Sequence, residues 1–454
     1  MLLNASSVLS LAPDEASAKA AKGLLSPAKW GASLGATERA VWGACQGSGS
    51  KPYQTQVDLT GAALSFKCSC PSRKFPCKHG LALMLLRADD AGLFQTATEP
   101  AWVTDWIDSR QQRAQKKQEK AEQALTDPAV AAESAASAAK REAARWQRIE
   151  AGVEDLERFL GDLLGRGLAS LGPEQVEAWK KMASRMVDAQ APGLGDMLKL
   201  AAEAQGQGSD WPEQVLRRMG RLQLCIEAVR RRDSLPEATR HDLKAALGWA
   251  MDRDIALTQG ERIADDWLVV GLVEQERDNG LTERRTWLVG TQTARRALVL
   301  DFTRTGQGFE VPWPMGRCVQ TTLAFYPGGQ PLRAVVAADM TAAETRDWPG
   351  YAPEHEWNAA ARQLAANPFA PLTLLLLTDV APARHGDGWW LRLDGDPPAH
   401  AVPLKLTQDQ GWDLLASATG LPLKLAGEWD GQVLRPTSAW SPEGLLCFDD
   451  KGGR

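Results

Sequence analysis

The sequence predicts an α+β protein of several domains: a small ββα unit near the N-terminus, a helical middle and a mainly antiparallel β C-terminal domain. Three cysteines and one histidine lie within twelve residues, from Cys68 to His79, between strand-like and helix-like segments. Apolar residues recur at helical spacing over residues 149–260. From residue 261 onward, short apolar runs separated by turn-forming residues are typical of antiparallel strands. A chain of 454 residues is too long for one ordinary domain.

Residues 1–100 are predicted to form the ββα unit with a helix ahead of it. The helix is expected near residues 13–25, which begin with Pro and acidic residues and end with Lys and Gly. Residues 53–59 alternate as a strand does, and residues 63–70 return the chain as the second strand of a hairpin. The apolar run of residues 80–88 then predicts a buried helix.

Residues 101–148 are predicted to be a charged linker, helical or disordered, because Ala, Gln, Lys and Glu dominate from Ser109 onward. Pro128 is expected to break it. Residues 149–260 are predicted to be a helical domain with helices near 153–164, 174–187, 211–229 and 235–251. Its expected core positions on the first two helices are Val153, Leu156, Leu160, Leu163, Leu164, Val176, Trp179, Met182 and Met186.

Residues 261–454 are predicted to form a β-rich domain with a helical insertion. A hairpin over residues 267–290 turns at Asn279-Gly280, a pair that favours positive φ. Residues 353–367 are expected to be the inserted helix. Further strands are expected at residues 297–302, 319–327, 332–339, 372–378, 389–395 and 401–406. No sequence period indicates a repeat architecture.

Cys68, Cys70, Cys77 and His79 are predicted to bind one Zn²⁺ in a closed structural site. Thiolate sulfur and imidazole nitrogen are the ligands that structural zinc takes, four at a time. Cys68 and Cys70 are expected on one face of a strand, and Cys77 and His79 at the start of the following helix. A disulfide between the first two cysteines would be strained. A nucleophilic Cys77 with His79 as its base would lack an orienting group.

The pattern C-x-C-x6-C-x-H between a hairpin and a helix resembles the SWIM-type zinc finger, over about residues 50–90. An apolar strand before Cys68, CSCP at the first pair and CKHGLAL at the helix start carry the resemblance. Residues 185–195 (RMVDAQAPGLG) are also similar to a stretch of bacterial SWIM-finger proteins. The resemblance implies ligand roles for the same four residues, and binding of DNA or proteins as the function.

A non-catalytic role is expected, because four protein ligands leave zinc no position for water or substrate. Two motifs that resemble catalytic ones are weak. GASLG at residues 31–35 matches a nucleophile motif but lacks the strand-turn-helix context, and HEWNA at residues 355–359 lacks the second histidine of a zinc protease. The acidic pair Asp265-Asp266 suits a cap or turn as well as a metal site.

The finger is predicted to bind a partner through Lys67, Arg73, Lys74, Phe75 and Lys78. Residues 1–88 hold ten Lys and Arg against four Asp and Glu, a balance of +6, whereas the whole chain carries −5. Basic side chains around Phe75 would suit phosphates and a stacked base, although packing of Phe75 on the finger's own core is favoured over base stacking.

Because the remaining residues carry −11, protein–protein contact is the expected function and DNA binding the alternative. Neither the partner nor the oligomeric state can be identified from the sequence. No run of about 20 apolar residues predicts a membrane span. The N-terminus lacks the basic start of a secretory signal. We therefore expect a cytoplasmic protein, whose clustered thiolates bind metal instead of forming disulfides.

Overall fold

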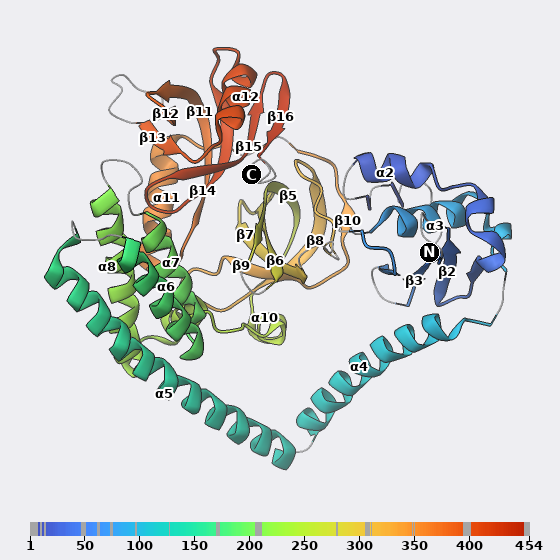
Figure 1. The fold of residues 1–454 in the computed structure, drawn as a ribbon, viewed down its shortest axis with the longest axis horizontal. Helices are drawn as coiled ribbons and strands as arrows, with labels where there is room; N and C mark the ends of the chain where they lie inside the picture. Colours follow the sequence, from blue (N-terminus) through green and yellow to red (C-terminus); the bar gives the residue numbers. More distant parts are fainter. Residues whose placement is uncertain are drawn as a thin grey trace.

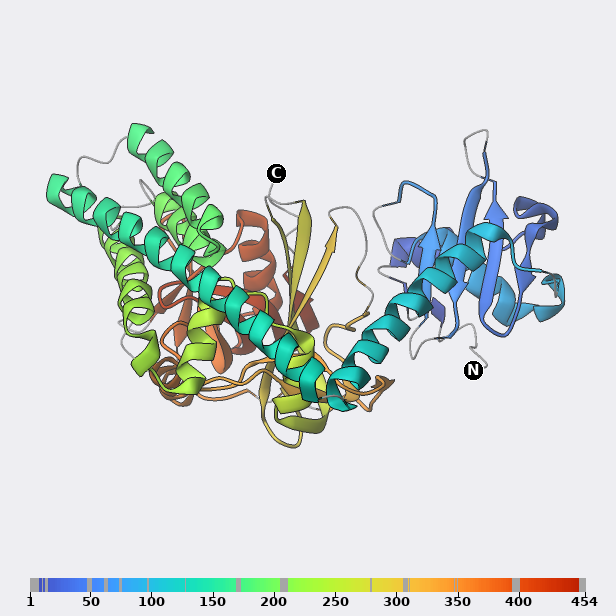
Figure 2. The ribbon, with the colours of Figure 1, turned by 90° about the horizontal axis from the view of Figure 1, so that it is seen from below.

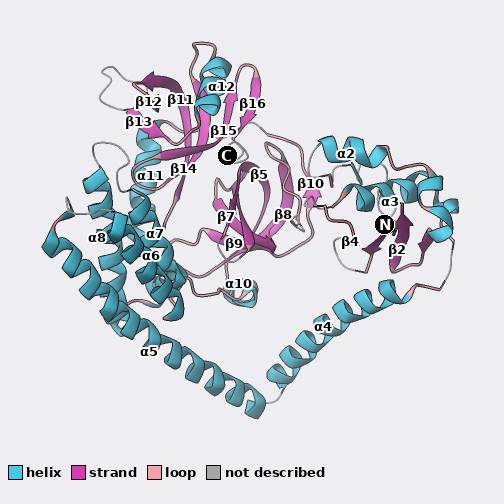
Figure 3. Cartoon of the chain, in the orientation of Figure 1, coloured by secondary structure: helices cyan, strands magenta, loops and turns pink. Residues whose placement is uncertain are grey.

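The computed structural model describes residues 8–448 apart from residues 10, 13–14, 47–50, 61–63, 73–75, 96–97, 127, 169–172, 205–210, 278–279, 305–308, 310, 347, 349 and 394–400. Figure 1 shows a finger domain at one side, a helical bundle at the other and β-sheets between, with two long helices joining the first two parts. Figure 3 shows that helices and strands are segregated in the same way along the chain. The predicted α+β arrangement of finger, helical middle and β-rich C-terminal region is therefore confirmed.

The finger domain is built on one four-stranded antiparallel sheet in the order β1-β2-β3-β4. The predicted helix, hairpin and following helix are α2, β3–β4 and α3; the strands β1 and β2 were not predicted. Its elements are α2 (Glu15–Lys22), η1 (Pro27–Lys29), η2 (Gly31–Ser33), β1 (Gly35–Ala36), β2 (Ala40–Cys45), β3 (Tyr53–Asp58), β4 (Ser65–Cys68), α3 (Lys78–Asp89) and η3 (Ala91–Leu93).

Helix α3 covers one face of this sheet and supplies most of the finger's core. Leu81, Leu83 and Leu85 of α3 are buried together with Val41 and Val57 of the sheet. Residues of β2 and β3 at the intervening positions are buried as well, among them Gln56 and Asp58, which alternation alone would place in solvent. A second layer must therefore cover the other face.

The predicted linker is helical. Helix α4 (Ala101–Thr126) and helix α5 (Pro128–Arg166) follow one another, and Pro128 begins the second helix, where a missing N–H is tolerated. Figure 2 shows the two helices meeting at an angle, with α4 reaching the finger domain and α5 reaching the bundle.

The helical domain is a bundle of α5 with the helices that follow it. These are α6 (Pro173–Asp188), α7 (Pro192–Glu203), α8 (Trp211–Arg230), η5 (Arg232–Ser234) and α9 (Glu237–Ala246). The predicted positions on α5 and α6 enter its core, except that Val176 is partly buried and Leu164 is 50% exposed. Leu163 faces the core, and its neighbour Leu164 lies about 100° further around the helix.

Helix α7 was not predicted, because Gly193 and Gly195 lower its helix propensity. Both glycines are needed for packing. A Cβ at Gly193 would lie 2.0 Å from the carbonyl oxygen of Ala246, and one at Gly195 would lie 2.8 Å from that of Ala183. The glycines thus let α7 lie directly against its neighbours.

The β-rich region contains two six-stranded sheets, each of which closes on itself through one additional strand pairing. The predicted strands and the inserted helix α11 are all present, and Gly280 has the expected positive φ of 73°. Asn279 lies outside the described residues. Helices α10 and α12 and strands β10 and β14–β16 were not predicted.

The first closed sheet follows helix α10 (Arg253–Gln259) and contains β5 (Arg262–Glu276), β6 (Leu281–Gly290), β7 (Arg296–Arg304), β8 (Cys318–Phe325), β9 (Arg333–Val336) and β10 (Thr341–Ala342). The second follows helix α11 (Pro353–Ala366) and contains β11 (Thr373–His385), β12 (Gly388–Leu393), β13 (Ala401–Leu404), helix α12 (Gln408–Ala418), β14 (Leu423–Trp429), β15 (Leu434–Ser441) and β16 (Gly444–Cys447).

The two closed sheets pack on one another through a buried ion pair inside an apolar contact. Arg285 of the first sheet donates to both carboxylate oxygens of Glu428 in the second, at 2.7 and 3.0 Å. Trp287 Nε1 donates to the same carboxylate at 2.7 Å. Around them lie Leu268, Val270, Val289, Leu374, Leu376 and Ala426.

None of the helices in the described part of the chain is long and apolar enough to cross a membrane. 

A carboxylate joins the bundle to the first closed sheet. Asp242 of α9 is 8% exposed and accepts the backbone N–H of Gly329, in the β8–β9 loop, at 2.8 Å. Burial raises the pKa of Asp242 from 3.8 to about 6, and the hydrogen bond from Gly329 opposes this rise.

We predict that Asp242→Asn removes a pH dependence of stability. Between pH 3.8 and about 6 the folded chain binds a proton that the unfolded chain has lost, so the free energy of unfolding falls as pH rises through this window. At neutral pH the variant should be more stable than the wild type by about 1–2 kcal/mol, and at pH 3.5 the two should be alike. Calorimetric unfolding across this pH range measures the difference. An equal difference at both pH values would contradict the prediction.

Candidate metal centre

The four predicted ligands come from the end of β4 and the start of α3. Cys68 is the last residue of β4, Cys70 lies in the bend after it, Cys77 caps the N-terminus of α3 and His79 lies in its first turn. The expectation that Cys68 and Cys70 both lie along a strand was wrong. Residues two apart on a strand are about 6.6 Å apart, too far for two sulfurs to share one ion, so the chain must bend at Cys70.

The ligand atoms of the four residues lie within 4.8 Å of one another. The Nδ1 atom of His79 is 3.8 Å from the sulfur of Cys68 and 3.9 Å from that of Cys77, which makes Nδ1 the ligating nitrogen. Zinc–sulfur bonds of about 2.3 Å and zinc–nitrogen bonds of about 2.0 Å put tetrahedral ligand atoms about 3.6 Å apart. The donor set and its spacing therefore fit Zn²⁺ with a contraction of at most about 1.2 Å between ligand atoms.

Neighbouring side chains orient the ligands. The hydroxyl of Thr55, a buried residue of β3, lies 3.2 Å from the sulfur of Cys68, and the ring of Tyr53 lies 5.1 Å from that of His79. The N–H of Gly80 donates to the sulfur of Cys77 at 3.5 Å. A Cβ on Gly80 would lie 2.9 Å from the ring of Phe66, so glycine lets α3 approach β4 closely enough for the ligands to converge.

The three thiols perturb one another. Contacts with Cys68 and then Cys70, followed by burial, raise the pKa of Cys77 well above the usual range of a thiol. Hydrogen bonding from Cys68 and then Cys77 lowers the pKa of Cys70. The cluster therefore retains protons that a cation must displace, which makes metal binding proton-linked.

Helix α4 forms the second layer over the finger's sheet. Val103 and Ile107 of α4 are buried against Ala40 and Trp42 of β2, on the face opposite α3. Gln56 donates its side-chain N–H to the carbonyl oxygen of Trp102 at 3.1 Å. The sheet that carries Cys68 is thus held between two helices.

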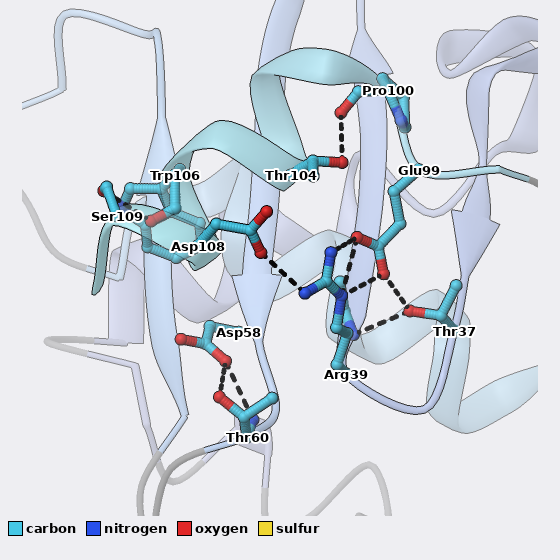
Figure 4. A network of polar contacts seen from close by, with 11 residues as sticks. Thr37, Arg39, Asp58, Thr60, Glu99, Pro100, Thr104, Trp106, Asp108 and Ser109 are labelled. Atoms are coloured by element: carbon cyan, nitrogen blue, oxygen red, sulfur yellow. Dashed lines mark hydrogen bonds and ion pairs between the residues drawn. The ribbon is translucent and has the colours of Figure 1, made fainter. Parts of the chain in front are cut away.

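A polar network fixes the start of α4 (Figure 4). Arg39 forms a bidentate ion pair with Glu99, with its shortest contact at 2.6 Å, and reaches Asp108 at 2.8 Å. Thr37 donates to Glu99 at 2.7 Å. Hydrogen bonding from Arg39 lowers the pKa of Glu99, and Arg110 pairs with the buried Asp58 at 3.3 Å. The signal for this layer in the sequence is the spacing of Trp102, Val103, Trp106 and Ile107.

The predicted partner-binding residues do not all fall in the described part of the chain. Arg73, Lys74 and Phe75 lie outside the described residues. Lys67 is exposed on β4, with its ammonium 5.9 Å from the ring of Trp106, so it lies on the α4 face. Lys78 is exposed at the first position of α3. Lys67 therefore lies on the α4 face of the sheet, whereas Lys78 lies on α3, which covers the other face.

The weak catalytic motifs have structural roles. The hydroxyl of Ser33, in GASLG, accepts the N–H of Ala44 at 2.8 Å. Glu356, in HEWNA, is fully buried, pairs with Arg296 at 2.5 Å and accepts the N–H of Leu376 at 2.7 Å. Asp265 accepts the N–H of Thr293 at 2.9 Å and so caps the turn after β6.

Two family descriptions match the chain. A SWIM zinc finger matches residues 53–88, which contain β3, β4 and most of α3, and a SWIM-associated four-helix bundle domain matches residues 144–247, from α5 to α9. Comparison with curated proteins and with solved structures finds no significant match. The resemblance inferred from C-x-C-x6-C-x-H is confirmed: the chain carries a SWIM zinc finger that binds Zn²⁺, together with the associated bundle.

We predict that Cys77→Ser loses the metal and unfolds the finger selectively. The wild type should contain one zinc per chain by elemental analysis, and the variant close to none, because three ligands hold the ion poorly. Hydrogen exchange should accelerate in β3, β4 and α3 but not in α5–α9. The wild type should also bind zinc more weakly as pH falls, because protons compete for the thiolates. Cys447→Ser, at an exposed cysteine of β16, is the matched control. Full zinc content in Cys77→Ser would refute the assignment.

We predict that Arg39→Ala releases α4 from the sheet. Loss of the ion pair with Glu99 should cost on the order of 1–3 kcal/mol and raise hydrogen exchange in residues 101–110. In the wild type, docking should weaken as pH falls through the lowered pKa of Glu99, since a depressed carboxyl pKa stabilises only above it. Arg158→Ala, which removes an exposed ion pair on α5, should leave this segment unchanged. Unaltered exchange in Arg39→Ala would contradict the role of the pair.

Proposed function

We propose that the chain is a zinc-stabilised, non-catalytic interaction protein whose finger domain binds an extended segment of a partner protein. The observation that carries this proposal is a groove of about 610 Å³ on the finger's sheet. The groove lies on the α4 face, since Trp42 and Ala44 occupy the same face of β2 as Ala40, which packs against α4. Pro100 and Trp102, at the start of α4, form part of its wall.

The walls of the groove combine rings and prolines with neutral polar side chains and suit an extended peptide. Trp102, Pro52, Pro100 and the mostly buried Trp42 line it together with Ser33, Gln54, Ser69, Gln95 and Thr98, and Lys51 is its one charged lining residue among those described. The ring of Trp42 lies against Gly35, where a Cβ would come within 2.3 Å of it. Aromatic grooves of this kind accept proline-containing segments, whose extended conformation is already formed before binding. One lysine complements one acidic side chain of such a segment.

Several properties favour a protein partner over nucleic acid at this groove. A nucleic-acid strand presents a phosphate at every nucleotide, and its binding depends on several cations acting together. A single lysine does not meet that requirement. Aromatic residues with few charges are instead typical of the centre of protein interfaces.

DNA binding by the finger is the second candidate. The observation that favours it is the absence of any acidic residue between Asp58 and Asp89 in the sequence, where five Lys and Arg occur. Lys67→Ala with Lys78→Ala would test it: binding of a labelled duplex at low salt should weaken, with a smaller dependence on salt. Binding that is unaffected by this double variant would remove these two lysines from any DNA site.

A non-catalytic role is supported by the chemistry of the site. Four protein ligands complete the tetrahedral shell that structural zinc prefers. We place the protein in the cytoplasm, because three ligand thiols require a reducing compartment to stay available for metal.

We predict that a displayed peptide library will select extended, proline-containing peptides with one acidic residue. Trp102→Ala should weaken binding of a selected peptide by about tenfold or more, as loss of an aromatic anchor does. Lys51→Glu should move the preference from acidic to basic residues, which is a readout that misfolding cannot produce. Lys67→Glu, on the same sheet face but outside the groove, should leave the preference unchanged. Peptides that bind equally well to wild type, Trp102→Ala and Lys51→Glu would refute the proposal.

A further inference from the structure

The two closed sheets share one strand-pairing topology. In each, the first strand pairs antiparallel with the second and the fourth, and the second pairs with the third. The fifth strand pairs antiparallel with the fourth and parallel with the third, which closes the sheet. In the second closed sheet, helix α12 lies between the third and fourth strands. This is the arrangement of an OB-fold, in which ligands bind over the second and third strands between two particular loops.

The first closed sheet has this face covered within the chain. Its second and third strands are β6 and β7, and Trp287, Val289 and Leu298 on them pack against the second closed sheet. The loop between its fourth and fifth strands is held by the hydrogen bond from Gly329 to Asp242. This face is therefore used to join domains.

In the described part of the chain, no other sheet covers the equivalent face of the second closed sheet, whose residues are half-buried or exposed. Its second and third strands are β12 and β13, which Figure 3 shows at the outer margin of that sheet. Trp389 and Leu391 point into the core, so the alternate residues Trp390 and Arg392 point outward. They pair in register with Pro403 and Ala401, and Arg392 and Lys405 are exposed. We call Trp390, Arg392, Ala401, Pro403 and Lys405 the β12–β13 face.

A groove of about 400 Å³ continues this face towards α11. It is lined by Pro403, by the loop between the fourth and fifth strands at Gln432, and by Trp357 and Trp429, whose rings lie 5.0 Å apart.

We propose that the β12–β13 face and this groove bind single-stranded nucleic acid. Trp390 stands between Pro403 and Ala383 and offers a surface on which a base can stack, and Trp357 and Trp429 offer a second. Arg392 and Lys405 can neutralise phosphates. Two of the five Lys and Arg in residues 373–447, Arg392 and Lys405, lie on this face. The acidic Asp430 accepts the N–H groups of Gln432 and Val433 within its own loop.

The chemistry favours nucleic acid over an oligosaccharide, the other ligand class of this fold. Sugars present many hydroxyl groups and need a matching number of hydrogen-bonding side chains. Gln432 is the only amide or hydroxyl side chain among the lining residues described for the groove, whereas two tryptophan rings line it and the cations Arg392 and Lys405 lie on the adjoining face. Stacking and charge are the interactions by which single strands bind without sequence preference.

The test is fluorescence anisotropy of a labelled oligothymidylate of about 15 nucleotides with the full zinc-loaded chain, at several salt concentrations. Trp390→Ala should weaken binding about tenfold, and Trp390→Phe should restore most of it. Arg392→Ala with Lys405→Ala should reduce the slope of log K against log salt by about 1.4. Phe302→Ala, an exposed aromatic of the first closed sheet, and Arg158→Ala are matched controls that should change nothing.

Three outcomes would overturn the proposal. The first is no binding at about 50 mM salt, where electrostatic affinity is high. The second is oligothymidylate binding that neither Trp390→Ala nor Arg392→Ala with Lys405→Ala changes. If that binding is lost only when Lys67 and Lys78 are replaced, the binding site is on the finger. The third is quenching of tryptophan fluorescence by neutral oligosaccharides, dependent on Trp390, without binding of oligothymidylate. None of these outcomes bears on peptide binding at the finger groove.

Discussion

Closure of the zinc site is the constraint on which the finger domain depends. The ion must hold the end of β4 against the start of α3, and this contact decides where α3 lies on the sheet. The buried residues of α3, from Leu81 to Leu86, then pack with Val41 and Val57 of the sheet. A core of this size is marginal by itself, because small domains bury a small fraction of their surface. The metal on one face of the sheet and helix α4 on the other supply the stability that the core alone does not provide.

The metal site could be predicted because all its determinants are local. Cys68, Cys70, Cys77 and His79 are near one another in the chain, so their chemistry and spacing suffice. The docking of α4 could not, because it joins Arg39 to Glu99 and Asp108, residues far apart in sequence. The composition from Ser109 onward predicted a solvated linker, and the apolar positions just before it (Trp102, Val103, Trp106 and Ile107) were included in that linker. The polar outer positions of β3 looked like a solvent-facing strand for the same reason.

The shared topology of the two closed sheets could not be predicted from the sequence, for another reason. Inward positions of a strand require only apolar character and suitable volume, so unrelated residues can build the same core. The first sheet uses Trp267 and Phe325, and the second uses Trp389 and Leu391. The order in which strands pair depends on contacts between residues far apart in the chain, so no local sequence pattern predicts it. The strands from β5 to β13 were predictable from apolar runs and alternation, apart from the two-residue β10, whereas β14 to β16 carry glycine, proline and charged residues that interrupt the pattern.

The spacing between the two proposed binding surfaces follows from helix geometry. The finger is fixed to α4 and the bundle includes α5, so helices of 26 and 39 residues lie between the two surfaces along the chain. At about 1.5 Å per residue these helices are about 39 and 58 Å long. A stiff spacer raises the effective concentration of a second ligand only when its sites match the spacer's span. On these two proposals, a partner that occupies both surfaces must span the distance that α4 and α5 set between them.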